Sequence, residues 1–171
     1  MHESKSLQTR TLQPVIYELG AAAYLCQQFE TSLLLLVSML TANEGVVTSE
    51  SFKKGLDAHS DKTLGRLASI FKTTLSLPEN YVEYIKKGVE KRNSLIHGFV
   101  MRNTSKLLSA EGRLEVVIEL QEAQRFIDER LQSLNEVLDH ALQVFGGNLD
   151  QLRREANFRF EPDIVDEIIQ H

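Results

Sequence analysis

Residues 12–42, LQPVIYELGAAAYLCQQFETSLLLLVSMLTA, decide the fold, because they predict one unusually long helix. At about 100° per residue, its apolar side chains fall on one stripe about 80° wide. The stripe consists of Val15, Leu19, Ala22, Cys26, Leu33, Val37 and Leu40. A further member of the stripe, Glu30, is charged, and a buried carboxylate without a partner is costly. We therefore expect Glu30 to pair with a cation on another helix.

The rest of the chain contains four further helical patterns. They begin near residues 49, 61, 78 and 121, and the last two end near residues 99 and 145. Between these two long helices, residues 106–109 and 113–118 flank Ala110-Glu111-Gly112, which predicts a small β-hairpin. With 171 residues and 42% hydrophobic content, the chain has room for one sizeable core. We expect an all-α bundle of four to five main helices with this small β-hairpin inserted before the last long helix.

Two glycines, Gly146 and Gly147, end the last long helical pattern. Residues 1–147 are therefore expected to form the helical domain. Residues 148–171 are expected to form a tail with a short helix, because four apolar residues there fall on one side: Ile164, Val165, Ile168 and Ile169. This tail either packs on the domain or docks on a partner.

Charge and residue counts exclude several classes of site. A net charge of −5 means that nucleic acid binding requires a local cluster of Lys and Arg. The single cysteine, Cys26, excludes an internal disulfide and a CxxC metal site, and its apolar neighbours suit the core. Four histidines lack an acidic or cysteine partner at ligand spacing and are expected at the surface: His2, His59, His140 and His171. We expect no metal and no cofactor.

The beginning of the chain is polar and lacks the apolar segment of a secretory signal. The most apolar run, Leu33 to Leu40, is about two turns long and too short to span a bilayer. We therefore expect a cytoplasmic protein with no membrane partner.

The stretch most informative about function is residues 91–99, KRNSLIHGF, near the end of the helix that starts at Pro78. The buried face of that helix is expected to contain Tyr81, Ile85, Gly88, Val89, Ile96 and Phe99. Arg92 lies in the middle of this face, where an aliphatic side chain is expected. We predict that Arg92 and Glu30 lie within about 6 Å of each other, since each would otherwise be an unpaired buried charge. A purely structural ion pair is the alternative to a functional role for Arg92.

The residue types of this stretch suit the cleavage of RNA. RNA carries its own nucleophile, the 2′-OH, so an enzyme needs only an acid–base group and a cation. His97 can transfer protons near neutral pH, and Arg92 can bind the phosphate with two N–H groups. Asn93 can orient His97 or hold the phosphate, and Lys91 and Arg102 are candidate substrate-binding cations. For His97 the alternative is an imidazole at a helix C-terminus, ahead of a stop at Gly98.

The string Arg-Asn-x-x-x-His-Gly at residues 92–98 resembles the motif of the HEPN superfamily (higher eukaryotes and prokaryotes nucleotide-binding domains). The glutamate of the long preceding helix and the stretch Asp61-Lys62-Thr63-Leu64-Gly65 are also similar to that family, and the resemblance covers about residues 12–145. It implies a metal-independent endoribonuclease of toxin or phage-defence type, with RNA as substrate and an antitoxin or other regulatory protein as a partner. Some family members are instead non-catalytic modules that bind a protein, RNA or nucleotide, and this is the alternative function.

One departure from a subfamily pattern concerns regulation. Some relatives carry a tyrosine two residues after the motif histidine, which a partner nucleotidyltransferase modifies. Position 99 is Phe in this chain, so we do not expect that regulation here.

Helix geometry places a condition on the predicted site. Arg92 and His97 are about 140° apart around an ideal helix, so they do not share a face. Either the helix loosens near Gly98, or two copies of the motif face each other across a two-fold axis. The resemblance favours the second arrangement, a homodimer.

Overall fold

The computed structural model describes residues 11–41, 49–74 and 78–145, and within them it is all-α. The helices are α2 (Gln13–Thr41), α3 (Ser49–His59), α4 (Leu64–Thr74), α5 (Glu79–Asn103), the 3₁₀ turn η1 (Lys106–Leu108) and α6 (Ala110–Phe145). The prediction of a bundle with four to five main helices is confirmed. The predicted tail, residues 148–171, lies outside the described residues.

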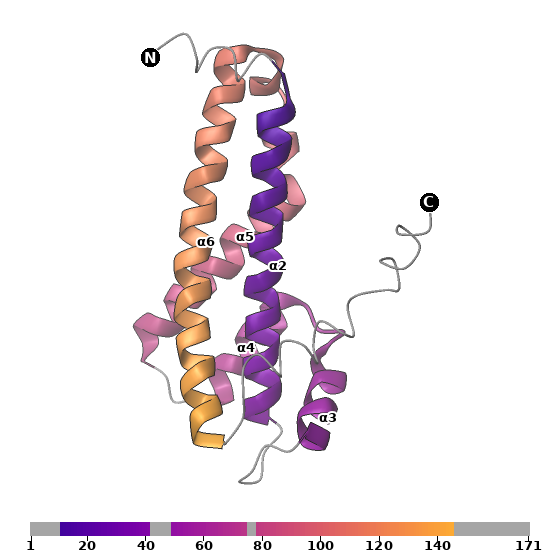
Figure 1. Cartoon of the computed structure of the whole chain (residues 1–171), viewed down its shortest axis with the longest axis vertical. Coiled ribbons are helices and arrows are strands. Elements are labelled where there is room, and N and C mark those ends of the chain that lie inside the picture. The colour runs from indigo at the N-terminus through magenta and orange to yellow at the C-terminus, as the bar shows by residue number, and fades with distance from the viewer. Residues whose placement is uncertain (1–10, 42–48, 75–77, 146–171) are drawn as a thin grey trace, which may run out of the picture.

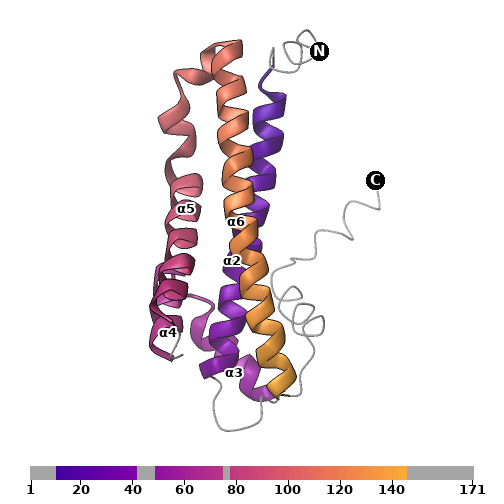
Figure 2. The ribbon, with the colours of Figure 1, turned by 90° about the vertical axis from the view of Figure 1, so that its left-hand side faces the viewer.

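The bundle is built on three long helices (Figure 1). α2 and α6 lie side by side and run in the same direction, and α5 runs beside α6 in the opposite direction (Figures 1 and 2). The two shorter helices, α3 and α4, lie at the end of the bundle where α2 finishes. That end therefore has more layers than the end where α2 begins, which consists of α2, α5, η1 and the first turns of α6.

The predicted β-hairpin is wrong, because residues 110–118 form the first turns of α6. The alternation of Leu114, Val116 and Ile118 is typical of a strand, yet only Val116 is buried, and Leu120 continues its stripe one turn later. The Ser109 hydroxyl accepts a hydrogen bond of 3.0 Å from the Gly112 backbone N–H, as an N-cap does. A helix start thus replaces the expected turn.

Gly88 of α5 permits the close packing that positions the motif one turn later. A Cβ at this position would lie 2.8 Å from the Phe29 ring and 3.0 Å from the Arg130 side chain. Arg130 is itself buried, lies against the rings of Tyr84 and Phe126, and donates to the backbone oxygens of both residues at 3.1 and 2.8 Å. These contacts set the distance and the rotation of α5 against α2 and α6.

By length and composition, α2 is apolar enough to cross a membrane. In this structure, however, 56% of its most apolar window is buried inside the protein, as in the central helix of a bundle. The expected cytoplasmic location stays a prediction.

Candidate active site

The motif lies inside a continuous helix. α5 runs from Glu79 to Asn103, so the predicted end near Phe99 is wrong, and so is the alternative in which the helix stops at Gly98. Gly98 is covered by Arg102, whose Nη1 would lie 2.6 Å from a Cβ at that position. His97 is therefore not a helix C-terminal residue, and loosening of the helix near Gly98 is not observed.

Glu30 and Arg92 form the predicted contact. Arg92 Nη2 donates to Glu30 Oε2 at 2.6 Å. The Arg92 side chain is only 18% exposed, and that of Glu30 is 33% exposed. Arg92 Nη1 donates to Asn93 Oδ1 at 3.1 Å, while Arg92 Nε is buried without a partner in the described part of the chain. The guanidinium is thus held in one orientation, from two sides.

The other predicted site residues are not gathered around Arg92 within one chain. His97 is exposed and makes no hydrogen bond or ion pair with Arg92 among the described residues. Lys91 is half-buried, and Arg102 folds back along its own helix, donating to the Ser94 backbone and hydroxyl oxygens at 3.0 and 2.7 Å. Lys91 and Arg102 lie about 120° and 140° around the helix from His97, so neither shares its face.

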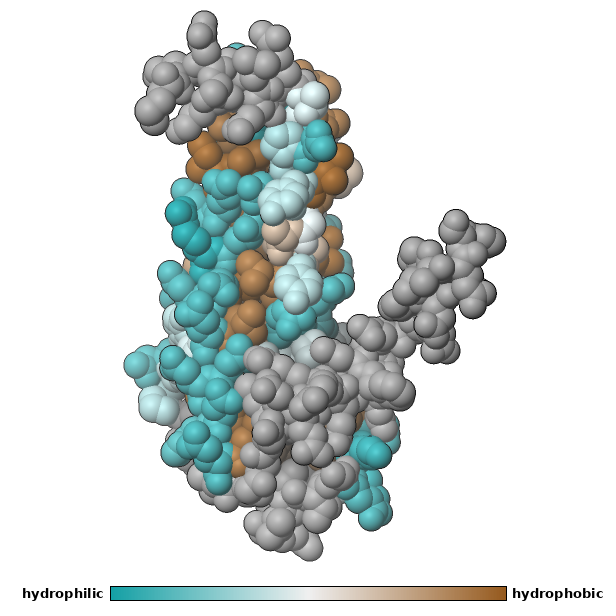
Figure 3. Space-filling view, viewed as in Figure 1, coloured by the Kyte–Doolittle hydropathy of each residue, from teal (hydrophilic) through white to brown (hydrophobic). Residues whose placement is uncertain are grey.

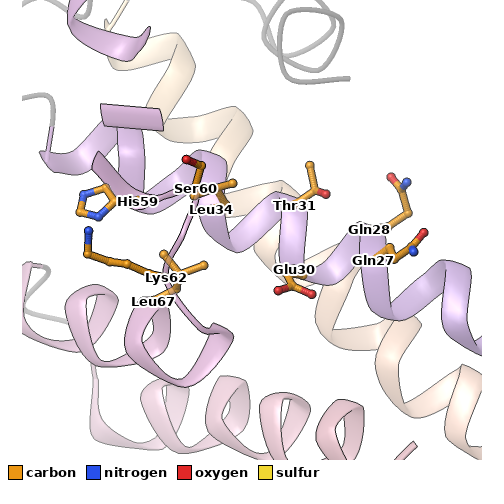
Figure 4. A pocket seen from close by; sticks show the side chains of 9 residues that line it. All are labelled: Gln27, Gln28, Glu30, Thr31, Leu34, His59, Ser60, Lys62 and Leu67. Carbon is orange, nitrogen blue, oxygen red and sulfur yellow. The ribbon is translucent and has the colours of Figure 1, made fainter. Parts of the chain in front are cut away.

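Two hollows lie along the same stripe of α2, one on each side of the Glu30–Arg92 pair. The motif hollow, about 380 Å³, is lined by Leu19 and Ala23 of α2 and by residues 95–101 of α5, including His97. The polar pocket, about 390 Å³, includes Glu30 itself (Figure 4). The residues that line the polar pocket are Gln27, Gln28, Glu30, Thr31, Leu34, His59, Ser60, Lys62 and Leu67.

His59 was expected at the surface, and the structure corrects this. It is only 9% exposed, and its Nε2 lies 2.8 Å from the Thr41 hydroxyl. That hydroxyl donates its own proton to the Val37 backbone oxygen at 2.8 Å, so it accepts a hydrogen bond from Nε2–H. Neutral His59 therefore carries its proton on Nε2, and its unprotonated Nδ1 is an acceptor. Nδ1 is buried and has no partner in the described ranges. The spacing of Phe52, Leu56 and His59 on α3 is the sequence signal that pointed to burial.

The environment of His59 disfavours its charged form. Burial lowers the pKa of this imidazole below its ordinary value of 6.5, and the Lys62 ammonium lowers it further. The Asp61 carboxylate partly offsets both effects. At neutral pH His59 is therefore neutral and can accept a hydrogen bond through Nδ1.

No protein family, curated protein or solved structure matches this chain. The resemblance to HEPN domains therefore rests on residues of this sequence, chiefly the motif at residues 92–98.

Among the residues that the structure describes, the remaining nucleophilic and metal-ligating groups do not form a second candidate centre. Cys26 is buried, and burial raises the pKa of its thiol to about 11, which makes it a poor nucleophile. Across residues 11–41, 49–74 and 78–145, no group of three or more His, Cys, Asp or Glu side chains is placed to hold a metal ion.

Exposed apolar side chains lie beside the motif hollow, toward the end of the bundle where α2 begins. Figure 3 shows hydrophobic residues at that end of the molecule. On α5, Val89 lies beside α4 and is 5% exposed, whereas Ile96 and Val100, further along the helix, are 42% and 50% exposed. Ile96 was predicted to be buried, and Leu95 takes that place instead. We call this surface the open face, and its exposed apolar residues on α5 are Ile96, Val100 and Met101.

Proposed function

We propose that this protein is a homodimeric, metal-independent endoribonuclease whose site is formed by Arg92, Asn93 and His97 of two copies. The observation that carries the proposal is an anchored guanidinium and an exposed imidazole on one unbroken helix, beside an uncovered apolar face. Glu30 acts as the positioning residue for Arg92. Lys91 and Arg102 remain candidates for contacts with the RNA backbone.

The proposed reaction divides the work between two histidines. The neutral His97 of one copy removes the proton from the 2′-OH, which attacks the phosphorus, and the protonated His97 of the other copy gives a proton to the departing 5′ oxygen. Arg92 retains N–H groups beyond the two that bind Glu30 and Asn93, and these stabilise charge on the phosphate. The products are a 2′,3′-cyclic phosphate and a 5′-OH.

The need for a second copy follows from the continuous helix. Within α5, Arg92 and His97 point about 140° apart, and no bend brings them together. The open face includes Ile96 and Val100, which flank His97 on α5, so a two-fold contact there would bring two copies of the motif together and cover apolar surface at once.

The decisive experiment is cleavage of a mixed RNA pool by purified protein in EDTA. The variants are His97→Ala and Arg92→Ala, with His140→Ala and Arg125→Ala as matched controls, because these two residues are exposed on α6. We expect cleavage with cyclic phosphate ends by the wild type and both controls, and its loss in both motif variants. Cleavage that survives His97→Ala would refute the proposed chemistry.

The alternative is a non-catalytic module that binds a protein, RNA or nucleotide partner through the open face. It is favoured by one observation, that both terminal nitrogens of Arg92 already have partners within the chain. A folded dimer that leaves the RNA pool intact supports this alternative.

The toxin or phage-defence setting, with a regulatory protein such as an antitoxin, belongs to the same proposal. Growth arrest on expression in the bacterial cytoplasm, relieved by His97→Ala but not by His140→Ala, is the expected result. Equal growth with wild type and His97→Ala would argue against a toxin.

A further inference from the structure

The polar pocket adjoins the proposed catalytic arginine through a shared residue. Glu30 lines the pocket and also holds Arg92 at 2.6 Å. On α2, the two hollows and Glu30 occupy one stripe from Leu19 to Leu34, which spans about 22 Å at about 1.5 Å per residue. At the stacked spacing of about 3.4 Å, this length accommodates up to about six nucleotides of one strand.

The lining of the pocket combines three kinds of chemistry (Figure 4). Leu34 and Leu67 are buried and supply an apolar floor, on which the face of a base can rest. Gln27 and Gln28 stand at one end, and side-chain amides are suited to paired hydrogen bonds with base edges. His59 and Lys62 stand together at the other end, which places a cation there for a phosphate.

Two groups in the pocket retain unused hydrogen-bonding capacity. Lys62 donates to the Ala58 backbone oxygen, and its ammonium carries three N–H groups, so donors remain for a ligand. The buried His59 Nδ1 has no partner among the residues that the structure describes and accepts a hydrogen bond in its neutral form. Glu30 uses Oε2 for Arg92, which leaves Oε1 to accept from a base amino group. A nucleotide offers both kinds of complement, a donor-bearing base and an anionic phosphate.

We propose that the polar pocket is the subsite for one unpaired nucleotide of the RNA substrate, next to the bond that is cleaved. Lys62 binds its phosphate, Leu34 and Leu67 contact the face of its base, and Gln27 and Gln28 read the base edge. Recognition of splayed bases is the usual basis of sequence preference for single-stranded RNA. This inference rests on the proposed function, and it makes Lys62 and Gln28 the determinants of affinity and of base preference.

The test measures binding without cleavage. The probe is a pool of hexamers with 2′-O-methyl groups at every position, which lack the attacking hydroxyl, and fluorescence anisotropy gives Kd at several salt concentrations. We expect Lys62→Ala to weaken binding several-fold and to reduce the slope of log Kd against log salt by about 0.7. With hexamers of single sequence, we expect Gln28→Ala to reduce base discrimination about tenfold while leaving that slope unchanged.

Lys54→Ala is the matched control, because Lys54 is an exposed lysine of α3 paired with Glu50 outside the pocket. Equal binding by Lys62→Ala, Gln28→Ala and Lys54→Ala overturns the subsite, and so does absence of wild-type binding to the pool at low salt. Lys62 is half-buried and Gln28 is partly exposed, and thermal melting verifies that both variants fold.

The outcomes separate this inference from the proposed function. Binding that depends on Lys62 in a protein that cleaves no RNA supports the subsite and contradicts the nuclease. Cleavage of unmodified RNA with unchanged sites and rate in Lys62→Ala and Gln28→Ala supports the nuclease and contradicts the subsite.

Discussion

Glu30 Oε2 lies 2.6 Å from Arg92 Nη2, which joins α2 and α5 by an ion pair between residues 62 positions apart in the sequence. Both residues occupy positions where the helical pattern calls for an apolar side chain. The pair therefore has two consequences: it contributes to the stability of the bundle, and it orients the guanidinium beside the open face.

The first prediction concerns the stability of this pair. Because both side chains are mostly shielded from water, a double-mutant cycle with Glu30→Ala and Arg92→Ala should give a coupling of about 1–2 kcal/mol in urea unfolding. The control cycle uses Glu50→Ala and Lys54→Ala. Lys54 Nζ lies 3.1 Å from Glu50 Oε1, and the side chains of Glu50 and Lys54 are 81% and 76% exposed. This exposed pair should give a coupling of less than about 0.5 kcal/mol. Equal couplings in the two cycles would show that burial does not strengthen the Glu30–Arg92 pair.

The second prediction concerns pH and His59. The pKa of His59 is lowered in the folded state. Below pH 6.5, its ordinary pKa, His59 therefore binds a proton more readily in the unfolded chain than in the folded protein. The stability that comes from neutral His59 is complete above pH 6.5 and is lost as the pH falls from 6.5 toward the lower, folded-state pKa. Urea unfolding between pH 8 and pH 5 should show this loss in the wild type and a smaller loss in His59→Gln. The exposed His140 serves as the control, and a His140→Gln variant should behave as the wild type does. Identical pH profiles for wild type and His59→Gln would contradict the prediction.

The third prediction concerns the open face. Val100→Asp places a charge in the proposed two-fold contact, and burial of an unpaired charge is costly enough to shift the protein to monomer. Sedimentation equilibrium measures this shift. The matched control is Ile118→Asp on α6, because Ile118 is 47% exposed and Val100 is 50% exposed. A wild type that is monomeric at high concentration, or a dimer unaffected by Val100→Asp, would exclude this contact.

The fourth prediction concerns the number of histidines in one site. If each cleavage uses His97 of both copies, a purified heterodimer of one wild-type and one His97→Ala chain should be nearly inactive. Two different affinity tags allow its purification after co-expression, and RNA cleavage in EDTA is the readout. A heterodimer with half of the wild-type activity would show that each copy carries a complete site. As a control, a heterodimer of one wild-type and one His140→Ala chain should have full activity.

The pattern of residues alone predicted the all-α bundle, its long central helix and the contact between Glu30 and Arg92. The helix and the contact depend on rules that act locally or in pairs. Helical periodicity identifies a buried stripe, and the cost of an unpaired buried charge then requires that two charged residues on buried stripes meet. No knowledge of the path of the chain is needed for either step.

The first turns of α6 and the burial of His59 could not be predicted from the local sequence pattern alone, because both depend on tertiary packing. The apolar residues Leu114, Val116 and Ile118 alternate as in a strand. These residues are helical, however, and Val116 packs in the core together with Leu120, one helical turn later. His59 ends α3, and its burial depends on where α3 meets the end of α2 and the Thr41 hydroxyl. Such contacts are set by the lengths and angles of neighbouring helices.

The sequence by itself thus determined the all-α bundle and the pairing of Glu30 with Arg92, while the tertiary structure decided which parts of each helix are covered. α5 presents the same flank at Val89 and at Ile96, yet Val89, beside α4, is buried, whereas Ile96, about two turns further along, is exposed. The side chains of one helix follow a period that the sequence contains, whereas the end of a neighbouring helix in space follows from how the whole chain packs.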